Sequence, residues 1–140
     1  MKRLIVALIL LTTAPFASTG SFADFAQAKA LTQTIMQHFI KEDFVGGLNL
    51  AKPYWPLPTA EVDELAMKTK FQWRIVKERF GSYQGMELIK EEKIGTSFVR
   101  LVYLHKFENH AIYWKFTFYN PNGAWKVNSI NFKDDIGSLF

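Results

Sequence analysis

The chain has 140 residues, of which 49% are hydrophobic and 21% charged, and its formal net charge is +4. These proportions exclude wholesale disorder, and the length suits one domain rather than two. The sequence has no cysteine, which excludes disulfides, thiolate zinc sites, cysteine nucleophiles and a lipid-modified cysteine.

Residues 1–23 have the pattern of a secretory signal peptide. A short basic start precedes an apolar run over 4–11, and small residues at Ser21 and Ala23 fit cleavage after Ala23. The run is too short to cross a bilayer, which needs about 20 apolar residues, although an uncleaved membrane anchor is the alternative. With no Asn-x-Ser/Thr motif present, we expect a bacterial protein that is exported, periplasmic or secreted, with no stable membrane span after cleavage.

Residues 24–140 form a single predicted domain that begins with helices. Apolar side chains recur at helical spacing from Asp24 to about Phe44, with Asp24 as the N-cap, and Gly46-Gly47 is expected to end or bend this helix. The spacing predicts a longer helix over Ala60–Phe80, with acidic residues in its first turns and basic residues in its last.

One side of the second predicted helix carries Lys70, Arg74 and Lys77. We interpret it as a solvated side on which Arg74 pairs with Glu78, four residues later. Contact with an anionic surface is the alternative.

From about Gln84 the hydrophobic period changes to two. Turn signals divide the rest into four strands with short connections, which predicts an antiparallel meander. The expected strands are Gly85–Lys93, Ser97–Phe107, His110–Tyr119 and Ala124–Lys133. The predicted fold class is therefore α+β, with N-terminal helices packed on a curved four-stranded antiparallel sheet.

Pairing about a Glu108-Asn109 hairpin makes the numbers of opposed residues sum to 217. The most apolar face of the sheet should then meet the helices, and it holds Val99, Leu101, Tyr103, His105, Ile112, Trp114, Phe116 and Phe118. If Tyr119 faces Ala124, Ile130 and Phe132 join this face only through a bulge near Asn128-Ser129. The direction of Glu87 is left open, because the first strand is ambiguous by one residue.

The opposite face of the sheet is also rich in apolar and aromatic residues. A homodimer packed through this face accounts for them, and a monomer with a few exposed aromatics is the alternative. The expected dimer residues are Phe98, Arg100, Val102, Leu104, Tyr113 and Tyr119.

The order of elements resembles the nuclear transport factor 2-like superfamily, the cystatin-like α+β cone, and in particular its small exported bacterial members of unassigned function. The resemblance lies in the segments Phe80 to Tyr83, Phe98 to Tyr103, Trp114 to Tyr119 and Gly123 to Val127, and in the tail 131–135. It implies a pocket between sheet and helices, and dimerisation through the sheet.

The resemblance and the residue types together suggest binding of a small apolar or amphipathic ligand, or of a protein partner, rather than catalysis. The expected ligand-binding residues are Tyr103, His105, Trp114, Trp125 and Trp73. An isomerase- or dehydratase-type enzyme using His105, with Glu87 as a second group, is one alternative. A structural module that interacts with the cell envelope through the outer sheet face is another.

Several kinds of chemistry have no motif in this sequence. The three histidines show neither HxH nor HExxH spacing, so no metal site is expected. There is no GxSxG, GxGxxG or P-loop pattern, and we expect no cofactor. Removal of the leader would leave 15 basic and 13 acidic residues, too small an excess to predict nucleic-acid binding.

Overall fold

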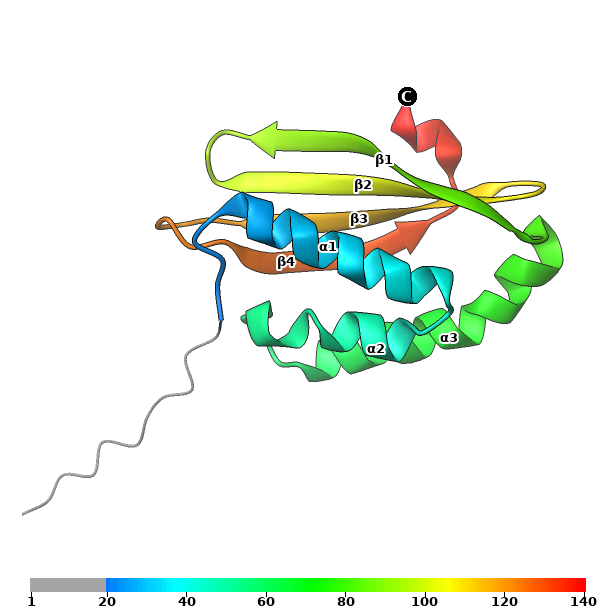
Figure 1. Ribbon diagram of the computed structural model, residues 1–140, viewed down its shortest axis with the longest axis horizontal. Coiled ribbons are helices and arrows are strands. Elements are labelled where there is room, and N and C mark those ends of the chain that lie inside the picture. The colour runs from blue at the N-terminus through cyan, green and yellow to red at the C-terminus, as the bar shows by residue number, and fades with distance from the viewer. Residues whose placement is uncertain (1–19) are drawn as a thin grey trace, which may run out of the picture.

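The computed structural model describes residues 20–140, and most of the predicted signal peptide lies outside these residues. In this part of the chain, helices α1 (Phe25–Ile40), α2 (Phe44–Asn49) and α3 (Ala60–Phe80) precede a four-stranded antiparallel sheet and pack against it (Figure 1). The 3₁₀ segment Lys52–Tyr54 joins α2 to the loop before α3. The predicted α+β class, with helices before strands, is confirmed.

The first helix is shorter than its apolar pattern predicts. Asp24 caps α1 as expected, accepting a hydrogen bond from the Ala26 amide at 3.0 Å, but the helix ends at Ile40. The prediction that Gly46-Gly47 ends it is wrong, because Asp43 caps a separate helix, α2, by accepting from the Gly46 amide. A Cβ atom at Gly47 would lie 2.8 Å from the Phe39 ring, so this glycine permits α2 to pack closely on α1.

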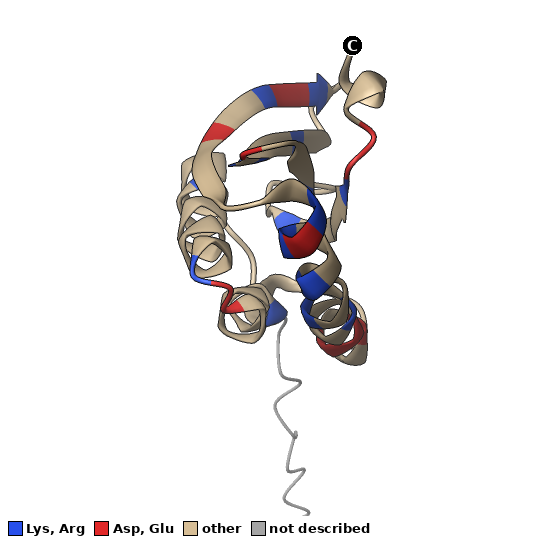
Figure 2. Ribbon diagram, turned by 90° about the vertical axis from the view of Figure 1, so that its right-hand side faces the viewer, with Lys and Arg blue, Asp and Glu red and all other residues tan. Residues whose placement is uncertain are grey.

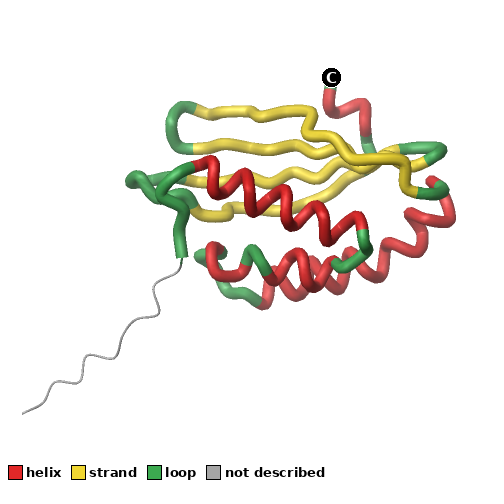
Figure 3. The backbone as a smooth tube through the Cα atoms, in the orientation of Figure 1, coloured by secondary structure: helices red, strands yellow, loops and turns green. Residues whose placement is uncertain are grey.

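The sheet has the strand order β1-β2-β3-β4, with β1 over Tyr83–Ile94, β2 over Phe98–Phe107, β3 over Ala111–Tyr119 and β4 over Lys126–Lys133. Short loops join consecutive strands, as the tube in Figure 3 shows. The predicted register of β2 and β3 is confirmed, since Tyr103 opposes Trp114 and His105 opposes Ile112.

A register shift in the last strand aligns its apolar side chains with the core. Val127 opposes Phe118, whereas Ile130 opposes Phe116, and the shift between these pairs falls at Asn128, where a bulge was predicted. Tyr119 opposes Lys126 rather than Ala124, so that part of the prediction is wrong. The turn after β3 is longer, because the Asn120 side chain accepts from the Gly123 amide and β4 starts later.

The first strand settles the direction of Glu87. A register shift lies between Leu88 and Lys90, and it leaves Leu88 opposite Tyr103 on the face toward the helices. Glu87 opposes Leu104 on the outer face, where its carboxylate lies 3.4 Å from the Lys106 ammonium. Glu87 and His105 therefore project from opposite faces of the sheet.

The core between helices and sheet is largely aromatic. The Phe39 ring lies 4.3 Å from Trp114, and Phe44 lies 4.5 Å from Trp73, measured between ring centroids. Phe22, before α1, is buried as well: it stacks on Tyr54 at 3.9 Å and its backbone bridges to Trp125. Residues from Phe22 onward thus belong to the folded domain.

The C-terminal segment covers part of the outer sheet face. The 3₁₀ segment Ile136–Leu139 lies on the side of the sheet away from the helices (Figure 1). The Tyr113 hydroxyl contacts Asp135 and Ser138 there, and the Lys90 ammonium donates to the Leu139 carbonyl.

Burial within one chain removes two residues from the expected dimer surface. Val102 and Tyr113 are fully buried within one chain, so they do not contribute to an open face. Phe98 and Tyr119 stack on each other at 4.6 Å toward the other end of the sheet, and Tyr119 remains exposed. The homodimer stays a prediction, now restricted to Phe98, Arg100, Leu104 and Tyr119.

Candidate functional site

The structure brings four of the five sequence-predicted ligand-binding residues together in the core. Trp73 comes from α3, Tyr103 and His105 from β2, and Trp114 from β3, and all four side chains are buried. The Trp73 ring lies 5.3 Å from His105 and 6.5 Å from Trp114. Trp125 is separate, only partly buried, and packs against Phe25 at 5.2 Å.

Three of these buried side chains carry a polar atom without a hydrogen-bond partner in residues 20–140. They are the Tyr103 hydroxyl, His105 Nδ1 and Trp114 Nε1. Burial lowers the pKa of His105 to about 4, so the imidazole is neutral near pH 7. Burial, with a smaller contribution from the Glu91 charge, raises the pKa of Tyr103 to about 12. Both groups are therefore held in their neutral forms.

These core residues border two separate hollows rather than one shared pocket. Trp73 and His105 line a small cavity of about 70 Å³ beside Glu42. Tyr103 lines a groove of about 590 Å³ between α1 and β1, together with Met36 and Met86. The His105–Glu87 pair of the enzymatic hypothesis is not available in this arrangement, because Glu87 lies on the other face of the sheet.

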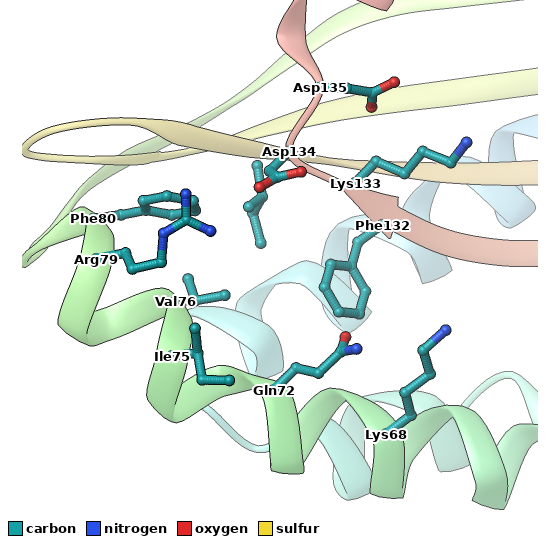
Figure 4. A pocket seen from close by; sticks show the side chains of 11 residues that line it. Lys68, Gln72, Ile75, Val76, Arg79, Phe80, Phe132, Lys133, Asp134 and Asp135 are labelled. Atoms are coloured by element: carbon teal, nitrogen blue, oxygen red, sulfur yellow. The ribbon is translucent and has the colours of Figure 1, made fainter.

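A third hollow, the α3–β4 groove, has a volume of about 530 Å³ and lies between α3 and the end of β4 (Figure 4). Its apolar lining comprises Ile75, Val76, Phe80, Ile112 and Phe132. Its polar lining comprises Lys68, Gln72, Arg79, Lys133, Asp134 and Asp135. The Phe132 ring connects this groove to the core, since it lies 4.8 Å from Trp114.

Cations occupy both ends of the α3–β4 groove. Lys68 lies on α3 at one end and Arg79 lies across from Asp134 at the other, while the Lys133 side chain extends from the end of β4 away from the groove (Figure 4). No carboxylate of residues 20–140 lies within salt-bridge distance of Lys68, Arg79 or Lys133. The groove thus offers charged amines beside an apolar wall.

One carboxylate and one backbone carbonyl at the rim of the groove are held by other residues. The Tyr113 hydroxyl donates to Asp135 from the outer face, and this bond holds the pKa of the Asp135 carboxyl below its usual range. His110 Nε2 lies 2.9 Å from the Asp134 carbonyl, which fixes the backbone at the end of β4.

Sequence reasoning missed the α3–β4 groove. Two signals for it exist in the sequence: Lys68, Gln72, Ile75 and Arg79 recur at helical spacing on one side of α3, and Phe132 falls on the inner sheet face once the bulge is placed. What the pattern did not reveal is that α3 lies beside β4, because that is set by packing between distant elements.

Comparison with known proteins finds no match for this chain. The chain matches no protein-family model, no curated protein and no solved structure. Within residues 20–140, none of the helices combines the length and apolarity that crossing a membrane requires. The same residues contain no cluster of three or more histidine or carboxylate side chains placed to hold a metal ion.

Proposed function

We propose that the chain is an exported nuclear transport factor 2-like domain that binds a small amphipathic anion in the α3–β4 groove without transforming it. The superfamily proposal is supported by helices that precede a four-stranded antiparallel sheet. The ligand proposal is supported by the groove itself, which is a more open site than the buried core around Trp114.

One observation carries the ligand class: two cations of α3, Lys68 and Arg79, flank an apolar wall and have no carboxylate of residues 20–140 within salt-bridge distance. Either cation can bind an anionic head group, while Phe132 and Ile75 contact an apolar body. A carboxylate, sulfonate or phosphate attached to a short hydrocarbon would satisfy both features. Cationic and purely apolar ligands would leave one of them unused.

Binding is favoured over catalysis because the groove lining contains no histidine, serine, threonine or tyrosine, and one of its two carboxylates, Asp135, accepts a hydrogen bond from Tyr113 on the outer face. His105, the candidate base in the sequence, is buried elsewhere and has no carboxylate partner in the structure described.

Dodecanoate is a suitable probe, used below the concentration at which it forms micelles. Titration calorimetry on the protein purified from cells should detect binding, and the variant Lys68→Gln/Arg79→Gln should bind about tenfold more weakly or worse. Lys70→Gln/Lys126→Gln removes the same charge from residues outside the groove and is the matched control. Gln72→Trp, which fills the groove, should also abolish binding.

The proposal fails if dodecanoate does not bind, or if the control pair weakens binding as much as the groove pair. An unchanged affinity in Gln72→Trp would also place the ligand elsewhere.

A further inference from the structure

The solvent-facing side of α3 carries large apolar side chains where a surface helix normally carries polar ones. Met67, Phe71 and Ile75 are spaced by four residues and are 64%, 81% and 47% exposed. The spacing places them in a line along the helix. The buried side of α3 consists of other residues, namely Val62, Ala66, Thr69, Trp73, Val76 and Phe80, so core packing does not explain this line.

Cationic residues flank this line on both sides. At 100° per residue, Lys70, Arg74 and Lys77 fall on one side of it, and Lys68 and Arg79 on the other. The segment 67–79 has five cations against one anion, Glu78, and Figure 2 shows Lys and Arg along α3. We call Met67, Phe71, Ile75 and these five cations the α3 ridge.

Ion pairs neutralise only part of the ridge. The Arg74–Glu78 pair predicted from the sequence is confirmed, at 3.6 Å, and Lys77 lies 3.1 Å from Glu42. Both pairs are largely exposed to solvent, so they hold the side chains weakly. Lys68, Lys70 and Arg79 have no carboxylate of residues 20–140 within salt-bridge distance, which leaves the ridge cationic.

We propose that the α3 ridge docks on an anionic phospholipid membrane. Lying flat on the bilayer, α3 would insert Phe71 and its two apolar neighbours among the head groups, and the flanking lysines and arginines would reach the lipid phosphates. An apolar strip between cationic margins is the pattern of helices that lie in the membrane interface. Each cation near an anionic surface adds about 1 kcal/mol of attraction, and long side chains can bury their stems while the charge stays in water.

A second copy of the chain fits the ridge less well. Packing one ridge on another would bring the two sets of cations together, and like charges at close range oppose association. The Phe71 ring also projects from the ridge, 81% exposed, and therefore suits a deformable surface.

The proposal is independent of the ligand proposed for the α3–β4 groove. Ile75, Lys68 and Arg79 line both features, but Met67, Phe71 and Lys70 do not line the groove. Substitutions at these three positions therefore test the membrane surface alone. Failure of dodecanoate to bind would leave the membrane proposal standing, and the reverse also holds.

Vesicle sedimentation tests the proposal. The full-length gene is expressed, and the protein is purified as the cell processes it. Wild type should sediment with vesicles of equal parts phosphatidylglycerol and phosphatidylcholine, less so at about 0.5 M salt, and not with phosphatidylcholine alone. Met67→Ser/Phe71→Ser should reduce binding about tenfold or more, and Lys70→Gln/Arg74→Gln should also reduce it. The control Lys106→Gln/Lys115→Gln removes equal charge from the outer sheet face and should bind like wild type.

The absence of cysteine permits a second, local readout. A polarity-sensitive fluorophore on Phe71→Cys should shift to the blue with phosphatidylglycerol vesicles, whereas the same label on Thr96→Cys, at the turn after β1, should not. Equal binding by Met67→Ser/Phe71→Ser, no binding by wild type, or equal shifts at both labels would overturn the proposal. So would a dimer, seen by sedimentation equilibrium, that Phe71→Ser converts to monomer.

Discussion

The indole nitrogen of Trp73 donates a hydrogen bond to Glu42 at 3.1 Å, across from α3 to the junction between α1 and α2. Glu42 has φ of 60°, and within residues 20–140 no other residue except glycine has a positive φ. A side chain of this kind rarely adopts that conformation, which costs about 1 kcal/mol or more. The contacts with Trp73 and Lys77 offset that cost, and they tie the helix junction to α3.

Two replacements of Glu42 should therefore distinguish the stability contributed by its hydrogen bond to the Trp73 indole from that contributed by its ion pair with Lys77. Glu42→Ala leaves the Trp73 N–H without its acceptor and should lower the free energy of unfolding by about 1–2 kcal/mol. Glu42→Gln retains an acceptor and loses only the exposed pair with Lys77, so its loss should stay under about 0.5 kcal/mol. Urea denaturation checks both values, and equal losses in the two variants would show that the indole bond contributes nothing.

The bulge at Asn128 gives a prediction about register. Deleting Asn128 removes the extra residue, so Val127, Ser129 and Ile130 would oppose Phe118, Thr117 and Phe116 in regular alternation, and Ile130 and Phe132 would stay inside. We therefore expect the deletion to keep the domain folded and to cost well under the roughly 3 kcal/mol that exposure of a large core side chain costs. Asn128→Ala keeps the chain length, and because its side chain is exposed it should change stability by about 0.5 kcal/mol at most. Thermal unfolding by circular dichroism measures both variants, and a deletion that loses more than about 3 kcal/mol would contradict the register argument.

Much of the fold could be predicted because its signals are local. The bounds of α3, the pairing of β2 with β3 and the bulge in β4 follow from periodicity and short turns. The break between α1 and α2 could not be read, because Glu42 and Asp43 carry no strong stop signal and the apolar spacing runs through them.

The candidate site was harder to predict for a physical reason. Alternation along a strand shows that Trp114 faces the helices, but whether the space there is empty or filled depends on how Phe39 and Trp73 pack from distant elements. The burial of Tyr113 is similar, since its hydroxyl contacts Asp135 and Ser138 of a C-terminal segment that folds back over the sheet.

The buried imidazole of His105 makes stability depend on pH. Its pKa is about 4 in the folded chain and about 6.5 when unfolded, so between these values the unfolded chain binds more protons. The contribution of His105 is fully present above about pH 6.5 and falls as the pH drops toward 4, by up to about 3 kcal/mol. His105→Leu should be less sensitive to pH in this window. The measurement is urea denaturation of both proteins at pH about 7.5 and about 5; the same pH dependence in both would show that His105 is not responsible.

The packing of Phe22 favours leader cleavage before this residue over the predicted cleavage after Ala23. Cleavage after Ala23 would remove a buried ring that stacks on Tyr54 and a backbone bridge to Trp125. Loss of a buried phenylalanine costs about 3 kcal/mol. Small residues also stand at Ser18 and Gly20, which have the spacing that cleavage after Gly20 requires.

With export as proposed, we therefore expect the mature chain to begin at Ser21 and to retain Phe22. Intact mass spectrometry of the protein from the periplasm or medium identifies the first residue. Phe22→Ala should lower the unfolding free energy by about 3 kcal/mol, whereas Ser21→Ala, at an exposed neighbouring position, should leave it unchanged. A mature chain that begins at Asp24 and is as stable as one that retains Phe22 would show that the ring adds nothing to the fold.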